Sequence, residues 1–129
     1  MNILEIDFLV PQIEEYFKSI LDRNNLVIEV SSDKTKIYLK NSNYSIMIYG
    51  EGWHGFALDI KLINEKSNEE YRLHQLIEKK RIKGSLLTKE EKEVLKKMPE
   101  GHNSQLLDFS FSIQHLEKYI NEEFGFVPE

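Results

Sequence analysis

The sequence predicts an α+β domain in which an antiparallel meander of four or five strands carries N- and C-terminal helices on one face. Three observations predict it: helical spacing of apolar residues after residue 11, strict alternation from 26 to 62, and helical spacing again near the C-terminus. A charged helical hairpin is predicted as an insertion before the last helix. The 129 residues fit a single domain, 1–129, whose core needs no metal or disulfide support.

The first predicted helix covers residues 11 to about 23. Ile13 and Phe17 fall on one helical face, while charged residues occupy the other. Pro11 suits the first turn, where a missing N–H costs nothing. Asn24 and Asn25 tolerate the left-handed conformation that ends many helices, so we expect the stop there.

Residues 26–62 alternate apolar and polar side chains, which predicts four antiparallel strands. Because residues opposite each other on antiparallel strands share a face, strand parity selects the pairing. With Ser32-Asp33 and Ser42-Asn43 at the centres of the first two turns, the aliphatic residues meet on one side. The predicted pairs are Ile28 with Ile37, Leu39 with Ile46, and Ile48 with Leu58. Residues 51–55 then form the third loop.

The opposite face of this sheet is predicted to be of mixed character. Its two rows are Val27, Tyr38, Met47 and Asp59, and then Glu29, Lys36, Tyr49 and Ala57. Glu29 opposite Lys36 predicts a cross-strand ion pair. The aromatic and thioether side chains leave two alternatives open: a helix covers this side, or the side is available to a partner.

Two sequences of the type Ser/Thr-x-x-Glu mark helix starts at Ser67 and Thr88. The first helix is predicted to end near Gly84, after a basic run. The second is predicted over about 89–98 and stops at Pro99. Both helices are strongly charged, and we expect their apolar stripes to pack on each other as a hairpin.

The segment before the last helix allows two interpretations. Apolar and polar residues alternate between 105 and 111, which favours a fifth strand; without it the sheet has four. Ser112 is the predicted N-cap of the last helix, and Gly125 ends that helix.

Composition excludes several classes of protein. With no cysteine there is no disulfide framework, thiolate nucleophile or cysteine metal site. No apolar run is long enough to span a bilayer and no basic region precedes the first apolar residues, so we expect a cytoplasmic protein without a membrane partner. A net charge of -5 disfavours nucleic acid and favours a basic partner. The basic run at 79–83 lacks interleaved aromatics, which also disfavours nucleic acid.

Catalytic patterns are missing from the sequence. The four histidines do not have helical metal-ligand spacings. Glu51, His54 and Asp59 come nearest to a ligand set, but a distant group would have to complete it. There is no G-x-S-x-G turn, and the paired glutamates fall on polar helical faces. We therefore expect no catalytic residue, no metal, no cofactor, and a protein that is not an enzyme.

The stretch GEGWHG, residues 50–55, holds half of the six glycines and the one tryptophan. Trp53 at a hairpin tip suits a binding hot spot, because an aromatic side chain buries much area at low entropic cost. The alternative is that Trp53 folds back over the sheet edge. The predicted partner-binding residues join this loop to the mixed face of the sheet: Tyr38, Met47, Tyr49, Glu51, Trp53, His54 and Asp59.

A leading helix PQIEEYFKSIL, a meander ending in YSIMIYGEGWHGFALDIKL and a trailing helix SIQHLEKYINEEF follow one another. In this arrangement the chain resembles the small acidic immunity proteins that bacteria make against contact-dependent or other polymorphic toxins. The resemblance implies a non-enzymatic inhibitor that binds and blocks a cognate toxin domain, often a nuclease. Two alternatives remain: a small enzyme or ligand-binding domain using the Glu51, His54 and Asp59 region, and a regulatory adaptor. The sequence indicates no oligomeric state.

Overall fold

The computed structural model describes residues 6–50, 58–84, 86–99 and 104–123. Within them, helices and strands follow in the order α1 (Ile6–Tyr16), α2 (Lys18–Asn24), β1 (Val27–Val30), β2 (Lys36–Lys40), β3 (Tyr44–Gly50), β4 (Leu58–Asn64), β5 (Glu70–Arg72), α3 (Leu73–Lys79), α4 (Lys89–Lys96) and α5 (Ser104–Glu123). The strands form one antiparallel sheet in the order β1-β2-β3-β4-β5. The predicted α+β meander is confirmed.

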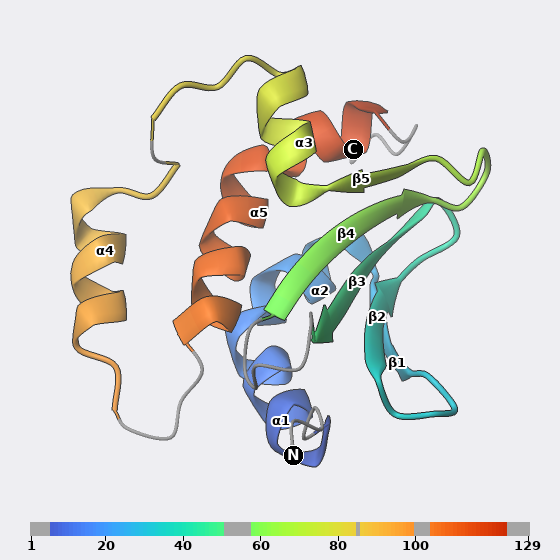
Figure 1. Ribbon diagram of the computed structural model, residues 1–129, viewed down its shortest axis with the longest axis horizontal. Coiled ribbons are helices and arrows are strands. Elements are labelled where there is room, and N and C mark those ends of the chain that lie inside the picture. The colour runs from blue at the N-terminus through green and yellow to red at the C-terminus, as the bar shows by residue number, and fades with distance from the viewer. Residues whose placement is uncertain (1–5, 51–57, 85, 100–103, 124–129) are drawn as a thin grey trace.

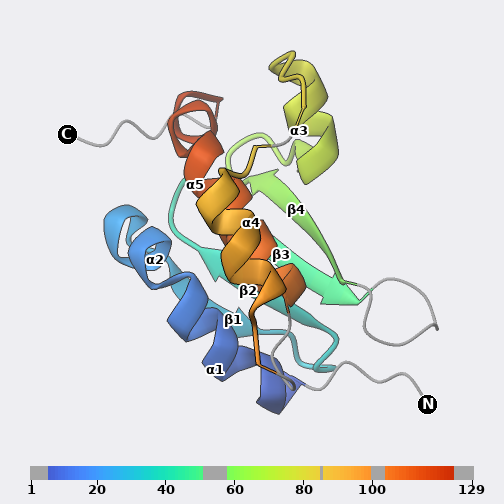
Figure 2. The same cartoon turned by 90° about the vertical axis from the view of Figure 1, so that its left-hand side faces the viewer.

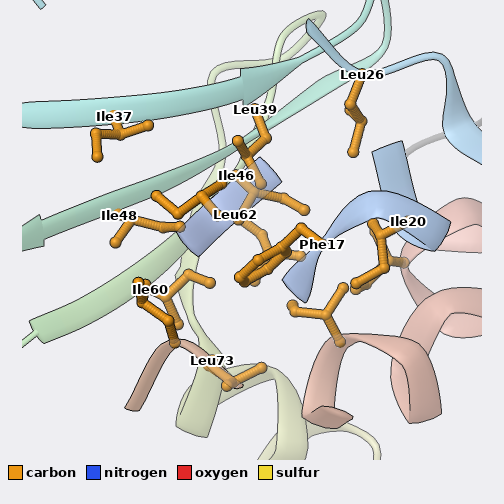
Figure 3. Close-up of a cluster of buried hydrophobic side chains, with 14 of the residues drawn as sticks. Phe17, Ile20, Leu26, Ile37, Leu39, Ile46, Ile48, Ile60, Leu62 and Leu73 are labelled. Carbon is orange, nitrogen blue, oxygen red and sulfur yellow. The ribbon is translucent and has the colours of Figure 1, made fainter. Parts of the chain in front are cut away.

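The helices α1, α2 and α5 lie on one side of the sheet (Figures 1 and 2), as predicted for the terminal helices. α4 lies against α5 on the side away from the strands, and α3 packs on β4 and β5. In Figure 3, Phe17, which lies between α1 and α2, points toward the strands, and Ile20 of α2 belongs to the same buried cluster. Six strand residues of this core are fully buried aliphatics: Ile37, Leu39, Ile46, Ile48, Ile60 and Leu62.

The leading helix begins earlier than predicted. Pro11 lies inside α1 rather than in its first turn. The apolar face continues upstream, since Leu9 is buried in the same core as Ile13. That packing outweighs the one hydrogen bond that a proline removes near a helix start. After Phe17 the chain continues as α2, and Asn25, with φ 54°, provides the predicted left-handed stop.

The sheet has the predicted faces but only part of the predicted register. The second hairpin pairs Leu39 with Ile46, as expected. The other two hairpins are shifted by two residues, so that Ile28 faces Leu39 and Ile48 faces Ile60. A shift of two keeps every side chain on its face, because the side-chain period of a strand is two. The inward set is therefore the predicted one.

The first hairpin loop is longer than the predicted two-residue turn because polar side chains close it. Ser31 Oγ accepts the backbone N–H of Lys36 at 3.0 Å. Asp33 Oδ1 accepts the backbone N–H of Thr35 at 3.1 Å and its hydroxyl at 2.7 Å. Lys34 takes a left-handed conformation, φ 57°. These bonds turn the chain through the whole segment between β1 and β2.

The helix start predicted at Ser67 is wrong: a hairpin turn and β5 (Glu70–Arg72) precede the helix, which is α3 (Leu73–Lys79). Asn64 Oδ1 accepts the backbone N–H groups of Lys66 at 2.9 Å and Ser67 at 3.2 Å, which reverses the chain. The helix begins only after Arg72, whose N–H donates to Gln75 Oε1 at 2.9 Å. Side chains that cap helices also close turns, so the local pattern did not distinguish the two.

The helix start at Thr88 is confirmed. Thr88 Oγ1 accepts the Glu91 N–H at 3.1 Å, and Glu91 Oε1 accepts the Thr88 N–H at 2.7 Å. α4 ends at Lys96, slightly before the predicted end. The two inserted helices pack on different elements, α3 on the strands and α4 on α5, in place of the predicted packing on each other.

The strand predicted over 105–111 is wrong, because α5 begins at Ser104. Leu106, Ser110 and Ile113 are buried at helical spacing. Ser110 Oγ donates to the Tyr16 carbonyl at 2.6 Å and fixes this turn against α1. The predicted N-cap Ser112 is therefore an interior residue of α5.

Candidate functional site

The face of the sheet opposite the helices, the open face, combines alternate residues of all five strands. Its three cross-strand rows are Val27-Lys40-Ser45-Ile63-Glu70, Glu29-Tyr38-Met47-Lys61-Arg72 and Lys36-Tyr49-Asp59. The buried apolar residues of α1, α2, α3 and α5 belong to the cluster on the other side of the sheet. Of the two alternatives for this face, the described helices leave it uncovered, since α1, α2 and α5 all lie on the other side of the strands (Figure 1).

Met47 lies at the centre of the open face. Its side chain is only 7% exposed, yet it does not belong to the core cluster. Its cross-strand neighbours are Tyr38 and Lys61, and Tyr38 and Tyr49 are both half-buried. Two tyrosines around a thioether give a rigid, polarisable apolar centre with polar tips, which is the composition of protein-binding hot spots.

A polar network fixes the Tyr49 side of the open face. Tyr49 Oη donates to Asp59 Oδ2 at 3.1 Å, and Arg72 Nε lies 3.7 Å from the same oxygen. Asp59 Oδ1 accepts the Ile60 N–H at 2.7 Å. Lys61 Nζ lies 5.7 Å from the centroid of the Tyr49 ring. Because these contacts orient the ring before any partner arrives, less side-chain entropy is lost on binding.

Ion pairs border the aromatic centre. Lys40 Nζ lies 3.6 Å from Glu29 Oε2, so the register shift has replaced the predicted pairing of Glu29 with Lys36. Lys61 Nζ lies 3.6 Å from Glu70 Oε1. Exposed pairs of this kind stabilise a fold by less than about 1 kcal/mol. They therefore define a polar rim more than they stabilise the sheet.

Ser45 is the unusual polar residue of the open face. It lies between Lys40 and Ile63 and is 1% exposed. Its hydroxyl has no hydrogen-bond partner in the described part of the chain. A buried hydroxyl without a partner costs about 1–3 kcal/mol. The unpaired hydroxyl of Ser45 therefore lowers the stability of the fold.

The predicted binding residues are only partly brought together. Four of them lie on the open face: Tyr38, Met47, Tyr49 and Asp59. The other three lie outside the described residues: Glu51, Trp53 and His54. Sequence reasoning missed two cations of this face, Lys61 and Arg72. Strand parity would have identified Lys61, whereas Arg72 had been assigned to a helix.

The basic run at the end of α3 has aromatic neighbours that the sequence did not indicate. Lys79 Nζ lies 4.7 Å from the ring centroid of Tyr71, and Lys80 Nζ lies 5.5 Å from that of Tyr119. Tyr71 Oη also donates to Glu69 Oε2 at 2.8 Å. These rings come from β5 and α5. Lys79 and Lys80 therefore lie over the two rings on which the bases of a bound nucleic acid would have to stack.

The described segments offer few clusters of side chains that could bind a metal ion or catalyse a reaction. No set of three or more His, Cys, Asp or Glu side chains there could hold a metal ion. Both carboxylate oxygens of Asp59 already accept hydrogen bonds. No helix in these segments is long and apolar enough to cross a membrane. No protein-family model, curated protein or solved structure matches the chain.

Proposed function

We propose that this chain is a toxin-neutralising inhibitor of the immunity-protein kind, which binds a cognate bacterial toxin domain through the open face and blocks it without catalysis. The observation that carries the proposal is the centre formed by Tyr38, Met47 and Tyr49 on a sheet face that the described helices leave uncovered. Aromatic anchors of this kind contribute most of the affinity in protein interfaces.

The toxin domain that fits this chain has a basic surface, as nucleases do. The net charge of -5 steers a basic domain toward the chain and raises the association rate. At the rim of the open face, Glu29 and Glu70 are held by exposed lysine pairs. Such pairs are weak, so exchanging these lysines for cations of a toxin costs little. The absence of cysteine suits a reducing cytoplasm, where the chain would meet its toxin.

Co-expression with the product of the adjacent open reading frame tests the proposal, because immunity genes lie beside their toxin genes. We expect the chain to protect cells from that product and to bind its toxin domain in calorimetry. Tyr38→Ala and Tyr49→Ala should each weaken binding by about tenfold or more. Tyr119→Ala is the matched control, since Tyr119 is a 39% exposed tyrosine of α5, off the open face.

The two parts of the proposal fail in different ways. If the wild-type chain neither protects cells nor binds the neighbouring product, the inhibitor function is wrong. If protection and affinity survive both open-face substitutions in folded variants, the function stands and the open face is not the binding surface. A loss of affinity in Tyr119→Ala as large as that in Tyr38→Ala would also place the contact elsewhere.

A further inference from the structure

β1 is an edge strand whose one charged side chain is Glu29. Among the described strands it is the first of the sheet and pairs with β2 alone. Natural edge strands are commonly blunted by lysine, proline or a bulge, because unpaired backbone groups invite another strand. β1 reads Val-Ile-Glu-Val and has neither lysine nor proline. Val27 is 66% exposed and Val30 is 36% exposed.

The other edge of the sheet differs. β5 has three residues and leads directly into α3. The N–H of Arg72, its last residue, donates to Gln75 Oε1 in the first turn of that helix. Of the two edges, β1 is therefore the one that offers a longer and more apolar strand to another chain.

The ladder between β1 and β2 shows which backbone groups of β1 face outward. Ser31 N–H donates to the Lys36 carbonyl at 3.0 Å, just beyond the last cross-strand pair. Hydrogen-bonded and non-bonded pairs alternate along an antiparallel ladder. Glu29 therefore bonds to β2, while Ile28 and Val30 direct their N–H and C=O groups away from the sheet.

We propose that a second copy of this chain occupies the edge, with the two β1 strands antiparallel about a two-fold axis at Ile28. Ile28 then faces Ile28 of the second copy, and the two residues exchange both N–H···O bonds. Leu26 faces Val30 on the helix side of the sheet, so the pairs there are apolar. Val27 faces Glu29 on the open-face side.

The sequence of β1 favours this register over its neighbour. An axis at Glu29 would place two carboxylates directly opposite each other, which is unfavourable in a strand pair. The axis at Ile28 separates them and is self-complementary, as a two-fold interface must be. It joins the two five-stranded sheets edge to edge, so the second copy does not lie over either open face. The proposal does not depend on the inhibitor function.

Sedimentation velocity of the full chain over a concentration series tests this pairing. We expect the mass to approach twice that of one chain as concentration rises. Val27→Asp places an acid opposite Glu29 of the second copy, twice in each dimer, whereas Val27→Lys places a cation there. The dimer dissociation constant should be about tenfold or more higher for the aspartate variant than for the lysine variant.

Val94→Asp is the matched control, because Val94 is a 49% exposed valine on α4, far from β1 in the chain. It should leave the dimer unchanged. A wild-type chain that stays monomeric at every concentration would overturn the proposal. So would a dimer that Val27→Asp and Val27→Lys weaken equally, because the register about Ile28 places residue 27 opposite Glu29 of the second copy. Val94→Asp adds the same charge away from β1 and so measures the effect of net charge alone.

Discussion

Glu117 of α5 ties the last helix to the leading helices, and its removal gives the sharpest test of how the fold is held. Its Oε1 accepts a hydrogen bond from Arg23 Nη2 at 2.6 Å. Its Oε2 accepts from Arg23 Nε at 3.0 Å and from Asn24 Nδ2 at 2.9 Å. The hydrogen bond to Glu117 also raises the pKa of Arg23. We predict that Glu117→Ala lowers the free energy of unfolding, because all three hydrogen bonds are lost.

The magnitude follows from the exposure of the partners. The side chain of Arg23 is 52% exposed, so its two bonds are screened and together stabilise the fold by about 0.5–1 kcal/mol. Asn24 is 1% exposed, and its bond to a carboxylate contributes about 1.5 kcal/mol. Glu117→Ala should therefore lower the free energy of unfolding by about 2 kcal/mol, which corresponds to a Tm lower by about 8 °C.

Urea unfolding followed by far-ultraviolet circular dichroism measures this change. Glu122→Ala is the control, because Glu122 is an exposed acid of the same helix, and the change there should stay within about 0.5 kcal/mol. Glu117→Gln keeps an acceptor for Asn24 and should fall between the two. A Glu117→Ala protein as stable as the Glu122→Ala protein would show that the link between α2 and α5 does not stabilise the fold.

Three further predictions concern single polar groups. Ser45→Ala should leave the free energy of unfolding unchanged or raise it by up to about 1 kcal/mol, because it removes the unpaired hydroxyl; a clear loss in urea unfolding would mean that the hydroxyl has a partner. Thr88→Ala should speed amide exchange in α4 by about fivefold, as the loss of an N-cap worth about 1 kcal/mol requires, and unchanged exchange would contradict the cap. Hydrogen bonds from Thr35 and Ser31 lower the pKa of Asp33 from 3.8 to about 2. A carboxyl whose pKa is lowered by folding stabilises the fold above its unfolded pKa, and this contribution is lost as the pH falls through the lowered pKa. Asp33→Asn should therefore remove part of the decrease in stability that the wild-type chain shows between about pH 4 and pH 2. Equal acid unfolding curves for the two proteins would contradict this.

Strand parity could be predicted from the sequence because it depends only on the side-chain period of two. Ile37, Leu39 and Ile46 therefore lie where the alternation placed them. The Thr88 cap could also be predicted, since its bonds are local. The segment from Ser104 could not, because its burial depends on α1, more than eighty residues earlier in the chain. An alternating stretch and one face of a helix look alike over so short a distance.

The chemistry of the open face depends on register as well as on parity. In the predicted register Tyr49 faces Ala57 and Asp59 faces Met47. The observed shift of two residues places Asp59 opposite Tyr49, where it accepts the phenol hydrogen bond, and Lys61 opposite Met47. The alternation of side chains along each strand thus decides which residues lie on this face. The turns and β5 decide which of these residues lie opposite each other. A two-residue register shift leaves the set of core residues unchanged but changes which side chains meet on the open face, so the turns of this meander determine the chemistry of that face as much as the strands do.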